Sequence, residues 1–177
     1  MIEAYDLSAR DIDSPSDPFL YITCNDKTFN DRENWQLDIS DPKFYKYFDF
    51  EGTFPGSSPI KIEVYDYDEI FGDDLIGTTI LDLEDRYFSL EWLQLEEKPI
   101  EYRQLYHESS SISQGVVKCW LEINPIEELS KQKTWDISAQ PPEEFEIRIA
   151  VFNAVDIPMM DVEGTSDVFF KGFFDSK

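Results

Sequence analysis

Basic residues are scarce in this chain of 177 residues. Lys and Arg number 15 against 38 Asp and Glu, which gives a formal net charge of −23 at pH 7. Proteins that bind phosphate backbones need a basic surface, so we expect no nucleic-acid partner. The same negative charge repels an anionic lipid surface.

Histidine, cysteine and long apolar runs are also scarce. The one histidine, His107, stands beside a Ser-rich loop, and there is no nucleophile elbow, phosphate-binding loop or Cys-His ligand pair, so we expect no enzyme. Cys24 and Cys119 lie in apolar, strand-like segments, which is typical of reduced core thiols in a cytosolic protein. No apolar run approaches 18 residues and no signal-peptide pattern begins at Met1, so we expect no spanning or translocated segment.

The abundance of aromatic and apolar residues indicates a folded β protein. Aromatic residues make up 15% of the chain and apolar residues 41%, which suits a packed core. About eight strands, separated by turn signals, are predicted by residue 124, and regular spacing of this kind favours an antiparallel sandwich. The clearest segments are 4–7, 19–24, 45–51, 60–65, 76–83, 102–106 and 117–123, with a partly helical excursion at 85–98.

One of these strands runs into a cluster of carboxylates. Residues 60–65 alternate between apolar and polar side chains, which predicts a strand with one face on the core. Asp66 and Asp68 continue the apolar parity, so they point to the core side beyond the end of the core. After a turn the chain returns through Asp73 and Asp74, which brings a third carboxylate back beside the first two.

Carboxylates gathered in this way repel one another, so a fold that collects them usually needs a cation. Oxygen ligands on flexible loops favour Ca²⁺ over Mg²⁺, which requires a tighter octahedron. An EF-hand is excluded because Phe71 stands where its loop needs Gly and Gly77 where it needs Glu. The alternative for this loop alone is a solvated acidic turn.

A second acidic loop precedes the strand at 19–24. It carries Asp11 and Asp17, the latter within Ser16-Asp17-Pro18-Phe19. Together the two loops resemble the calcium-binding loops of a C2 domain, in which an Asp and a Ser-Asp-Pro-Phe/Tyr turn lie on one loop and Asp-x-Asp with a further Asp on another. The resemblance implies a Ca²⁺ cofactor and five carboxylate ligands, with main-chain carbonyls near Ile12 and Tyr67 as extra ligands. These five are Asp11, Asp17, Asp66, Asp68 and Asp74.

The pattern of residues 4–19 returns 150 residues later. Ala4, Asp6, Asp11, Ser16, Asp17 and Phe19 recur as Ala154, Asp156, Asp161, Ser166, Asp167 and Phe169. An internal repeat of this kind predicts tandem domains. We therefore expect a C2 domain at 1–124, a linker at 125–144 and the N-terminal part of a second, incomplete C2 domain at 145–177, with Asp161 and Asp167 as its metal ligands. The chain is interpreted as a piece of a longer array.

Further stretches are similar to the penultimate C2 domain of ferlins and to the start of their last one. They are Asn30-Asp31-Arg32-Glu33-Asn34, Val64 to Asp68, Ile76-Gly77 with Asp82 to Arg86, Trp120 to Pro125, and Val151-Phe152-Asn153 to Gly172. The resemblance implies a parent chain anchored by a C-terminal transmembrane helix that is not present here. It also implies a place at the cytoplasmic face of a membrane, beside neighbouring C2 domains, in vesicle fusion, membrane trafficking or membrane repair.

The resulting fold prediction is an all-β, eight-stranded antiparallel C2-type sandwich with a truncated first strand, followed by the opening strands of a second unit. The leading function is calcium-dependent binding to anionic phospholipid membranes, with Ile12, Ile70 and Phe71 as membrane contacts; alternatively these apolar residues pack between neighbouring loops. The alternative function is a calcium-insensitive C2 scaffold for protein interactions. The short first strand leaves two possibilities open: residues 1–7 pair as a short edge, or residues 145–152 dock on the first unit.

Overall fold

The computed structural model describes residues 3–11, 13–131, 136–138, 146–160, 162, 164 and 166–172. The chain divides into two compact units, residues 1–140 and 141–177. All strands and helices of the described residues belong to the first unit. The second unit has no regular element among its described residues.

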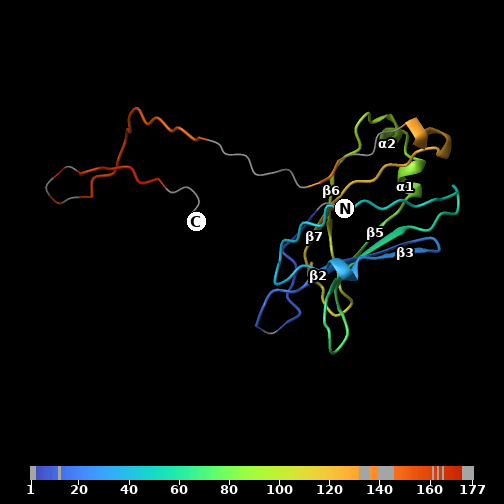
Figure 1. Ribbon diagram of the computed structural model, residues 1–177. Helices are drawn as coiled ribbons and strands as arrows, with labels where there is room; N and C mark the ends of the chain where they lie inside the picture. The colour runs from blue at the N-terminus through green and yellow to red at the C-terminus, as the bar shows by residue number, and fades with distance from the viewer. Residues whose placement is uncertain are drawn as a thin grey trace. The chain divides into compact units, whose positions relative to one another are not determined.

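Two antiparallel sheets make up the first unit (Figure 1). One sheet has the order β1-β7-β6, formed by Glu3–Tyr5, Val116–Cys119 and Glu101–Gln104. The other has the order β3-β2-β4-β5, formed by Lys27–Asn30, Pro18–Cys24, Ile60–Asp66 and Asp74–Leu81. The helical segments are short: η1 (Arg32–Asn34), α1 (Glu84–Tyr87), α2 (Leu90–Gln94) and η2 (Ile126–Lys131). Within the described ranges, no helix is long and apolar enough to cross a bilayer.

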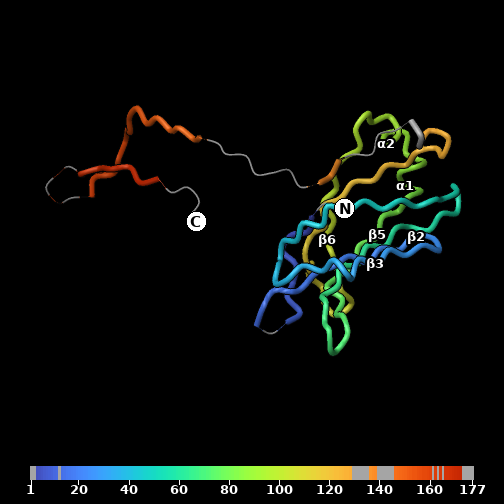
Figure 2. The backbone as a smooth tube through the Cα atoms, viewed as in Figure 1, coloured from blue at the N-terminus to red at the C-terminus, as the bar shows by residue number. Residues whose placement is uncertain are grey.

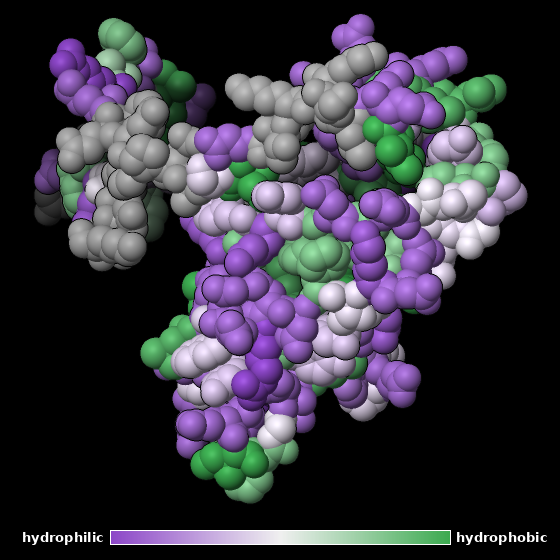
Figure 3. All heavy atoms as spheres, turned by 45° about the vertical axis from the view of Figure 1, so that its right-hand side comes forward, coloured by the Kyte–Doolittle hydropathy of each residue, from purple (hydrophilic) through white to green (hydrophobic). Residues whose placement is uncertain are grey.

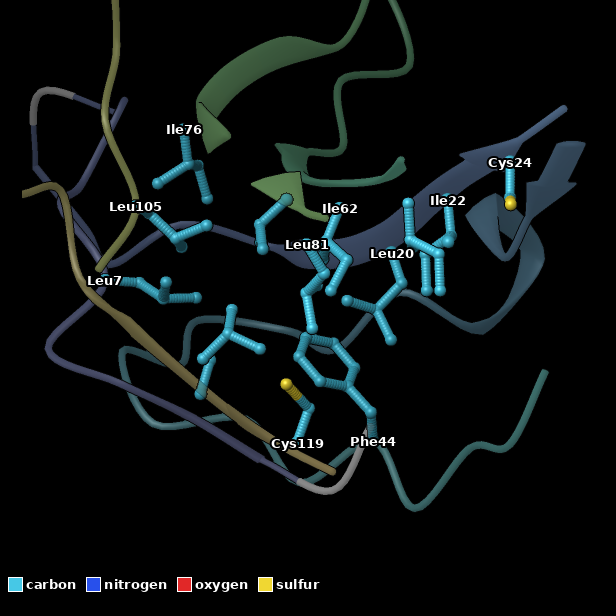
Figure 4. Close-up of a cluster of buried hydrophobic side chains, with 14 of the residues drawn as sticks. Leu7, Leu20, Ile22, Cys24, Phe44, Ile62, Ile76, Leu81, Leu105 and Cys119 are labelled. Carbon is cyan, nitrogen blue, oxygen red and sulfur yellow. The ribbon is translucent and has the colours of Figure 1, made fainter. Parts of the chain in front are cut away.

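The core lies between the sheets and follows from strand alternation. Leu20 and Ile22 on β2 and Val64 on β4 are almost fully buried, and they meet Val117 on β7. Side chains of one parity along each strand share one face, so the apolar half of each strand closes the core. Figure 4 shows labelled core side chains from both sheets, with Phe44 and Cys119 facing Leu81.

The predicted strand at 45–51 is wrong, and the described residues form seven strands rather than eight. Residues 44–53 belong to no ladder, and Tyr45 has a positive φ of 48° that interrupts an extended path. Phe48 and Phe50 still pack against the core, and the centroids of their rings lie 5.3 and 5.2 Å from that of Phe29. Alternation at 45–51 therefore marks buried side chains without backbone pairing.

The first strand forms a short edge, as one of the two alternatives predicted. The N–H groups of Ala4 and Leu7 donate to the carbonyl oxygens of Pro42 and Ser40 at 2.9 and 3.0 Å, so the segment before Phe44 runs along the outer side of β1 (Figure 2). In the second unit, the described residues 146–160 contain no strand, so the opening strand expected there is not found; Phe145 lies outside the described residues.

Both cysteines are free and buried, as predicted. Burial raises the pKa of the Cys119 thiol to about 11 and also raises the pKa of Cys24. Because the thiolate is the reactive form, we expect Cys119 in the native chain at pH 8 to react with a chromogenic disulfide roughly a hundredfold more slowly than in the unfolded chain. Absorbance with and without guanidinium chloride measures this, and fast reaction of both thiols in the native chain would contradict the buried positions.

Candidate functional site

Two acidic loops lie together at one end of the sandwich. Loop A, residues 7–17, leads into β2, and loop B, residues 67–73, joins β4 to β5. Pro18 is paired with Asp66, and the N–H of Tyr67 donates to the carbonyl oxygen of Asp17 at 3.0 Å. The sheet itself therefore holds the loops side by side, at the end opposite to α1 and α2 (Figures 1 and 2).

Asp66 is the most buried carboxylate of this end, with 4% of its surface exposed. Its Oδ1 accepts a hydrogen bond from the N–H of Asp17 at 2.6 Å. Burial raises the pKa of Asp66, and the negative charges of Asp11 and Asp17 raise it further, against the lowering effect of the hydrogen bond from the Asp17 amide. The structure thus brings Asp11, Asp17 and Asp66 within electrostatic reach of one another.

Asp74 and Asp68 are placed by β5 and loop B. Asp74 begins β5 directly opposite Asp66 in the ladder, so the two side chains share one face of the sheet. The Asp68 carboxylate turns to its own loop, where Oδ1 accepts from the N–H groups of Ile70 and Phe71 at 2.7 and 3.1 Å. Loop B is therefore closed by an Asp turn at its tip.

Ser16 gives loop A its shape. It is 1% exposed, and its hydroxyl accepts from the N–H of Arg10 at 2.9 Å and donates to the carbonyl oxygen of Ser8 at 3.3 Å. Because this buried hydroxyl both accepts and donates a hydrogen bond, it closes the loop ahead of Asp17. The Arg10 guanidinium then donates to the carbonyl oxygens of Leu75 and Ile76 at 3.1 and 2.5 Å, which ties loop A to the start of β5.

The second unit repeats this loop shape. The Ser166 hydroxyl accepts from the N–H of Met160 at 2.8 Å and donates to the carbonyl oxygen of Pro158 at 3.3 Å. These are the positions of Ser16, Arg10 and Ser8 shifted by 150. Asp156 also has a positive φ of 55°, against 51° for Asp6. Asp167 follows this turn and is exposed, and Asp161 lies outside the described residues.

A third loop, which sequence reasoning missed, completes this end. Residues 35–39, named loop C, lie against loop A because the N–H of Asp38 donates to Asp17 Oδ1 at 2.7 Å and that of Ile39 to the carbonyl oxygen of Ser16 at 3.0 Å. Leu37 at its tip is 68% exposed. In the sequence this stretch is only a polar segment, and no spacing pattern connects it to Asp17.

The tip of loop B is apolar and exposed. Ile70 is 80% exposed and Phe71 89% exposed. Figure 3 shows apolar atoms at the lower end of the first unit, where loop B lies in Figure 1. The structure therefore does not bury these two side chains between loops; Ile12, the third predicted membrane contact, lies outside the described residues.

The carboxylates are not gathered as ligands of one ion. In the part of the chain that the structure describes, no group of three or more His, Cys, Asp or Glu side chains is arranged to hold a metal. Asp17, Asp66 and Asp68 each accept a backbone N–H instead. All five predicted carboxylates nevertheless lie on loops A and B or at the adjoining ends of β4 and β5.

A two-sheet antiparallel sandwich with acidic loops at one end is the architecture of a known family, and comparison with that family agrees. The family model of the C2 domain matches residues 1–105, and the chain belongs to the C2 domain family. Solved structures similar to this chain include the two consecutive C2 domains of extended synaptotagmin 2. One structure of that domain pair has 25% identity and a TM-score of 0.53, covering 73% of this chain and 42% of that one. A calcium-bound structure of the pair has 24% identity and a TM-score of 0.54, covering 73% of this chain and 47% of that one.

The chain's relatives in sequence include ferlins. It is 29% identical to Ferlin 2 of Toxoplasma gondii over 161 residues, which cover 87% of this chain and 11% of that protein. It is 33% identical to Myoferlin of Xenopus tropicalis over 89 residues, which cover 50% of this chain and 5% of that protein. The chain thus spans only a small part of these relatives.

Proposed function

We propose that the first unit binds anionic phospholipid membranes through Ca²⁺ held between loops A and B. The observation that carries this proposal is the meeting of two acidic loops at one end of the sandwich, beside an exposed apolar tip. The net charge of −23 repels anionic lipid, and a bound cation would reverse the sign of the potential at this end alone.

The donor set fits calcium. All candidate groups are carboxylate or carbonyl oxygens on loops, which suits an ion that accepts six to eight oxygens at flexible angles. Bound Ca²⁺ supplies positive charge and open coordination positions for lipid phosphate or carboxylate oxygens. Asp66 anchors the set because the sheet fixes it, and Asp74 stands on the same face. Asp68 could join them through Oδ2, because the amides of Ile70 and Phe71 both donate to Oδ1.

Two measurements on the full chain test the proposal. Calorimetry should show Ca²⁺ binding that Mg²⁺ does not reproduce. Co-sedimentation with vesicles of phosphatidylserine and phosphatidylcholine should require Ca²⁺ and be reversed by a chelator. Absence of Ca²⁺ binding in calorimetry would reject the proposal.

A calcium-insensitive scaffold is the second candidate. It is favoured by one observation, namely that the carboxylates of Asp17, Asp66 and Asp68 already have backbone donors. A scaffold of this kind would keep its loops unchanged on addition of Ca²⁺. Vesicle binding that is equal with Ca²⁺ and with chelator, or absent in both, separates it from the first candidate.

Replacing Phe71 with alanine should weaken vesicle binding and leave Ca²⁺ affinity unchanged. The ring is exposed in the free chain, and its full burial in lipid would contribute about 2–3 kcal/mol. The matched control is Phe88→Ala, because Phe88 is a 58% exposed ring at the end of α1, at the far end of the sandwich. Equal losses in the two variants would show that loop B does not enter the membrane.

The wider proposals follow from the ferlin relatives. Residues 145–177, after a linker at 125–144, would be the N-terminal part of another C2 domain, which the repeated Ser166 turn supports. The parent protein would act at the cytoplasmic face of a membrane in trafficking, vesicle fusion or repair, beside neighbouring C2 domains. We assign no catalytic step to this chain.

A further inference from the structure

Arg32 of η1 contacts loop B at three residues. Its Nε donates to Asp73 Oδ2 at 2.6 Å, and its Nη2 donates to the carbonyl oxygen of Asp68 at 3.0 Å. The guanidinium carbon lies 4.2 Å from the centroid of the Tyr67 ring. That ring is stacked on Trp35, with centroids 4.7 Å apart and an interplanar angle of 5°. One side chain thus holds both the beginning and the end of the loop.

Asp73 makes a second bond that closes the loop on itself. Its Oδ1 accepts from the N–H of Asp68 at 3.1 Å while Oδ2 faces Arg32. The ion pair between Arg32 Nε and Asp73 Oδ2, at 2.6 Å, uses one carboxylate oxygen while the other holds the Asp68 amide. Arg32, Asp73 and the amide of Asp68 form one connected network.

This network contacts only the main chain of Asp68 among the predicted calcium ligands, through its N–H and its carbonyl oxygen. Tyr67 follows Asp66 at the end of β4, so by alternation its side chain points away from the face that Asp66 and Asp74 share. Asp73 is not among the five predicted ligands. Arg32 therefore supports loop B from the side opposite to the proposed ion.

We propose that Arg32 is a positioning residue for the calcium site: it orders loop B before the ion binds and so raises the Ca²⁺ affinity of carboxylates that its own side chain does not contact. This inference rests on the proposed calcium function.

Two effects of Arg32 on Ca²⁺ affinity oppose each other, because its charge repels a cation while its contacts order the loop. The repulsion is small, since Asp73 neutralises the charge and solvent screens the remainder. Ordering is the larger effect, because every loop residue that must be fixed on binding costs conformational entropy.

Arg32→Ala should therefore weaken Ca²⁺ binding, by roughly tenfold if one or two loop residues lose their order. The sign decides between the two effects, because simple removal of a positive charge would tighten Ca²⁺ binding. Arg32→Lys keeps the charge but lacks the planar fork that serves Asp73 and Asp68 together, so it should restore little of the affinity. Asp73→Asn should reproduce the loss of loop order measured by amide exchange, and the double variant with Arg32→Ala should add nothing further to it.

The experiment combines calorimetry with amide hydrogen exchange of the full chain without calcium. Exchange of the Asp68, Ile70 and Phe71 amides should speed up in Arg32→Ala. The matched control is Lys61→Ala, which removes an exposed positive charge from the other end of β4, where Lys61 pairs with Glu63 at 2.7 Å. It should leave loop B exchange and Ca²⁺ affinity unchanged.

The possible results bear on the proposed role of Arg32 as follows. Unchanged exchange in Arg32→Ala, or faster exchange with unchanged or tighter Ca²⁺ binding, would overturn it. If the unmodified chain binds no Ca²⁺, the proposed function fails and Arg32 has no calcium site to position, while the exchange data still show whether it orders the loop. If Arg32→Ala does not fold, Arg32→Met carries the same test, because it also removes the positive charge and the hydrogen-bond donors but keeps an unbranched apolar stem.

Discussion

Vesicle sedimentation in the presence of Ca²⁺ should be lost when Asp66 and Asp68 are both replaced with asparagine. The two substitutions remove two of five predicted carboxylate ligands, and Ca²⁺ affinity depends strongly on ligand charge, so we expect at least a roughly hundredfold loss of affinity. Calorimetry and co-sedimentation measure the two effects separately. Glu96→Gln with Glu97→Gln is the charge-matched control, because both glutamates are exposed residues beyond α2 at the far end of the sandwich.

The same double variant should be more heat-stable than the unmodified chain when calcium is removed. The folded-state pKa of Asp66 is raised, so the folded chain binds its proton more tightly than the unfolded chain does. The contribution of Asp66 to the free energy of unfolding is therefore fully present below the pKa that Asp66 has in the unfolded chain. It is lost as the pH rises through the pKa that Asp66 has in the folded chain. At neutral pH the charged carboxylate opposes folding, and an asparagine at position 66 can still accept the Asp17 N–H. A lower melting temperature, or undiminished vesicle binding, would favour the scaffold over the calcium site.

A second large loss is expected for Gly115→Ala, this time in stability. Gly115 has φ of +131°, and an added Cβ would lie 2.9 Å from Leu7 Cδ2, 3.0 Å from the carbonyl oxygen of Tyr5 and 3.1 Å from that of Asp6. The backbone oxygens cannot move without shifting β1 and the start of loop A. Strained φ and overpacking together should cost about 3 kcal/mol of unfolding free energy in a denaturant titration.

Gly56→Ala separates the two causes of this loss. Gly56 also has a positive φ, +112°, but a Cβ there would meet no atom within 4 Å. It should therefore show only the backbone penalty, about 1 kcal/mol. Equal losses at the two positions would mean that β1 yields without cost and that the packing around Gly115 is loose.

The acidic end could be predicted because its information is local. The parity of Asp66 with the core residues of β4, and the turn that returns to Asp74, follow from strand geometry within one stretch of sequence. The Ser16 turn is equally local, and its recurrence at Ser166 is visible as a repeat. In contrast, the contact of Arg32 with Asp73 joins residues 41 positions apart. No spacing rule connects these two, so the network around loop B was missed.

The strand predicted at 45–51 shows the limit of alternation as evidence. A period of two reports which side chains face the core, and Phe48 and Phe50 do pack against it. It does not report whether the backbone has a neighbouring strand to pair with. That depends on distant segments, as does the partner of β1, which proved to be the stretch before Phe44 in addition to β7.

The two serine turns also bear on the order of folding. The Ser16 hydroxyl bonds a residue eight positions away, whereas the β1–β7 ladder has to bring Glu3 to Lys118. A loop of about ten residues closes in roughly 10–100 ns, while pairing across most of a chain is a slow step. The same turn forms at Ser166 in a unit whose described residues have no strand at all. One wall of the proposed calcium site is thus encoded by a local turn, which can close before β4 and β7 are available to pair.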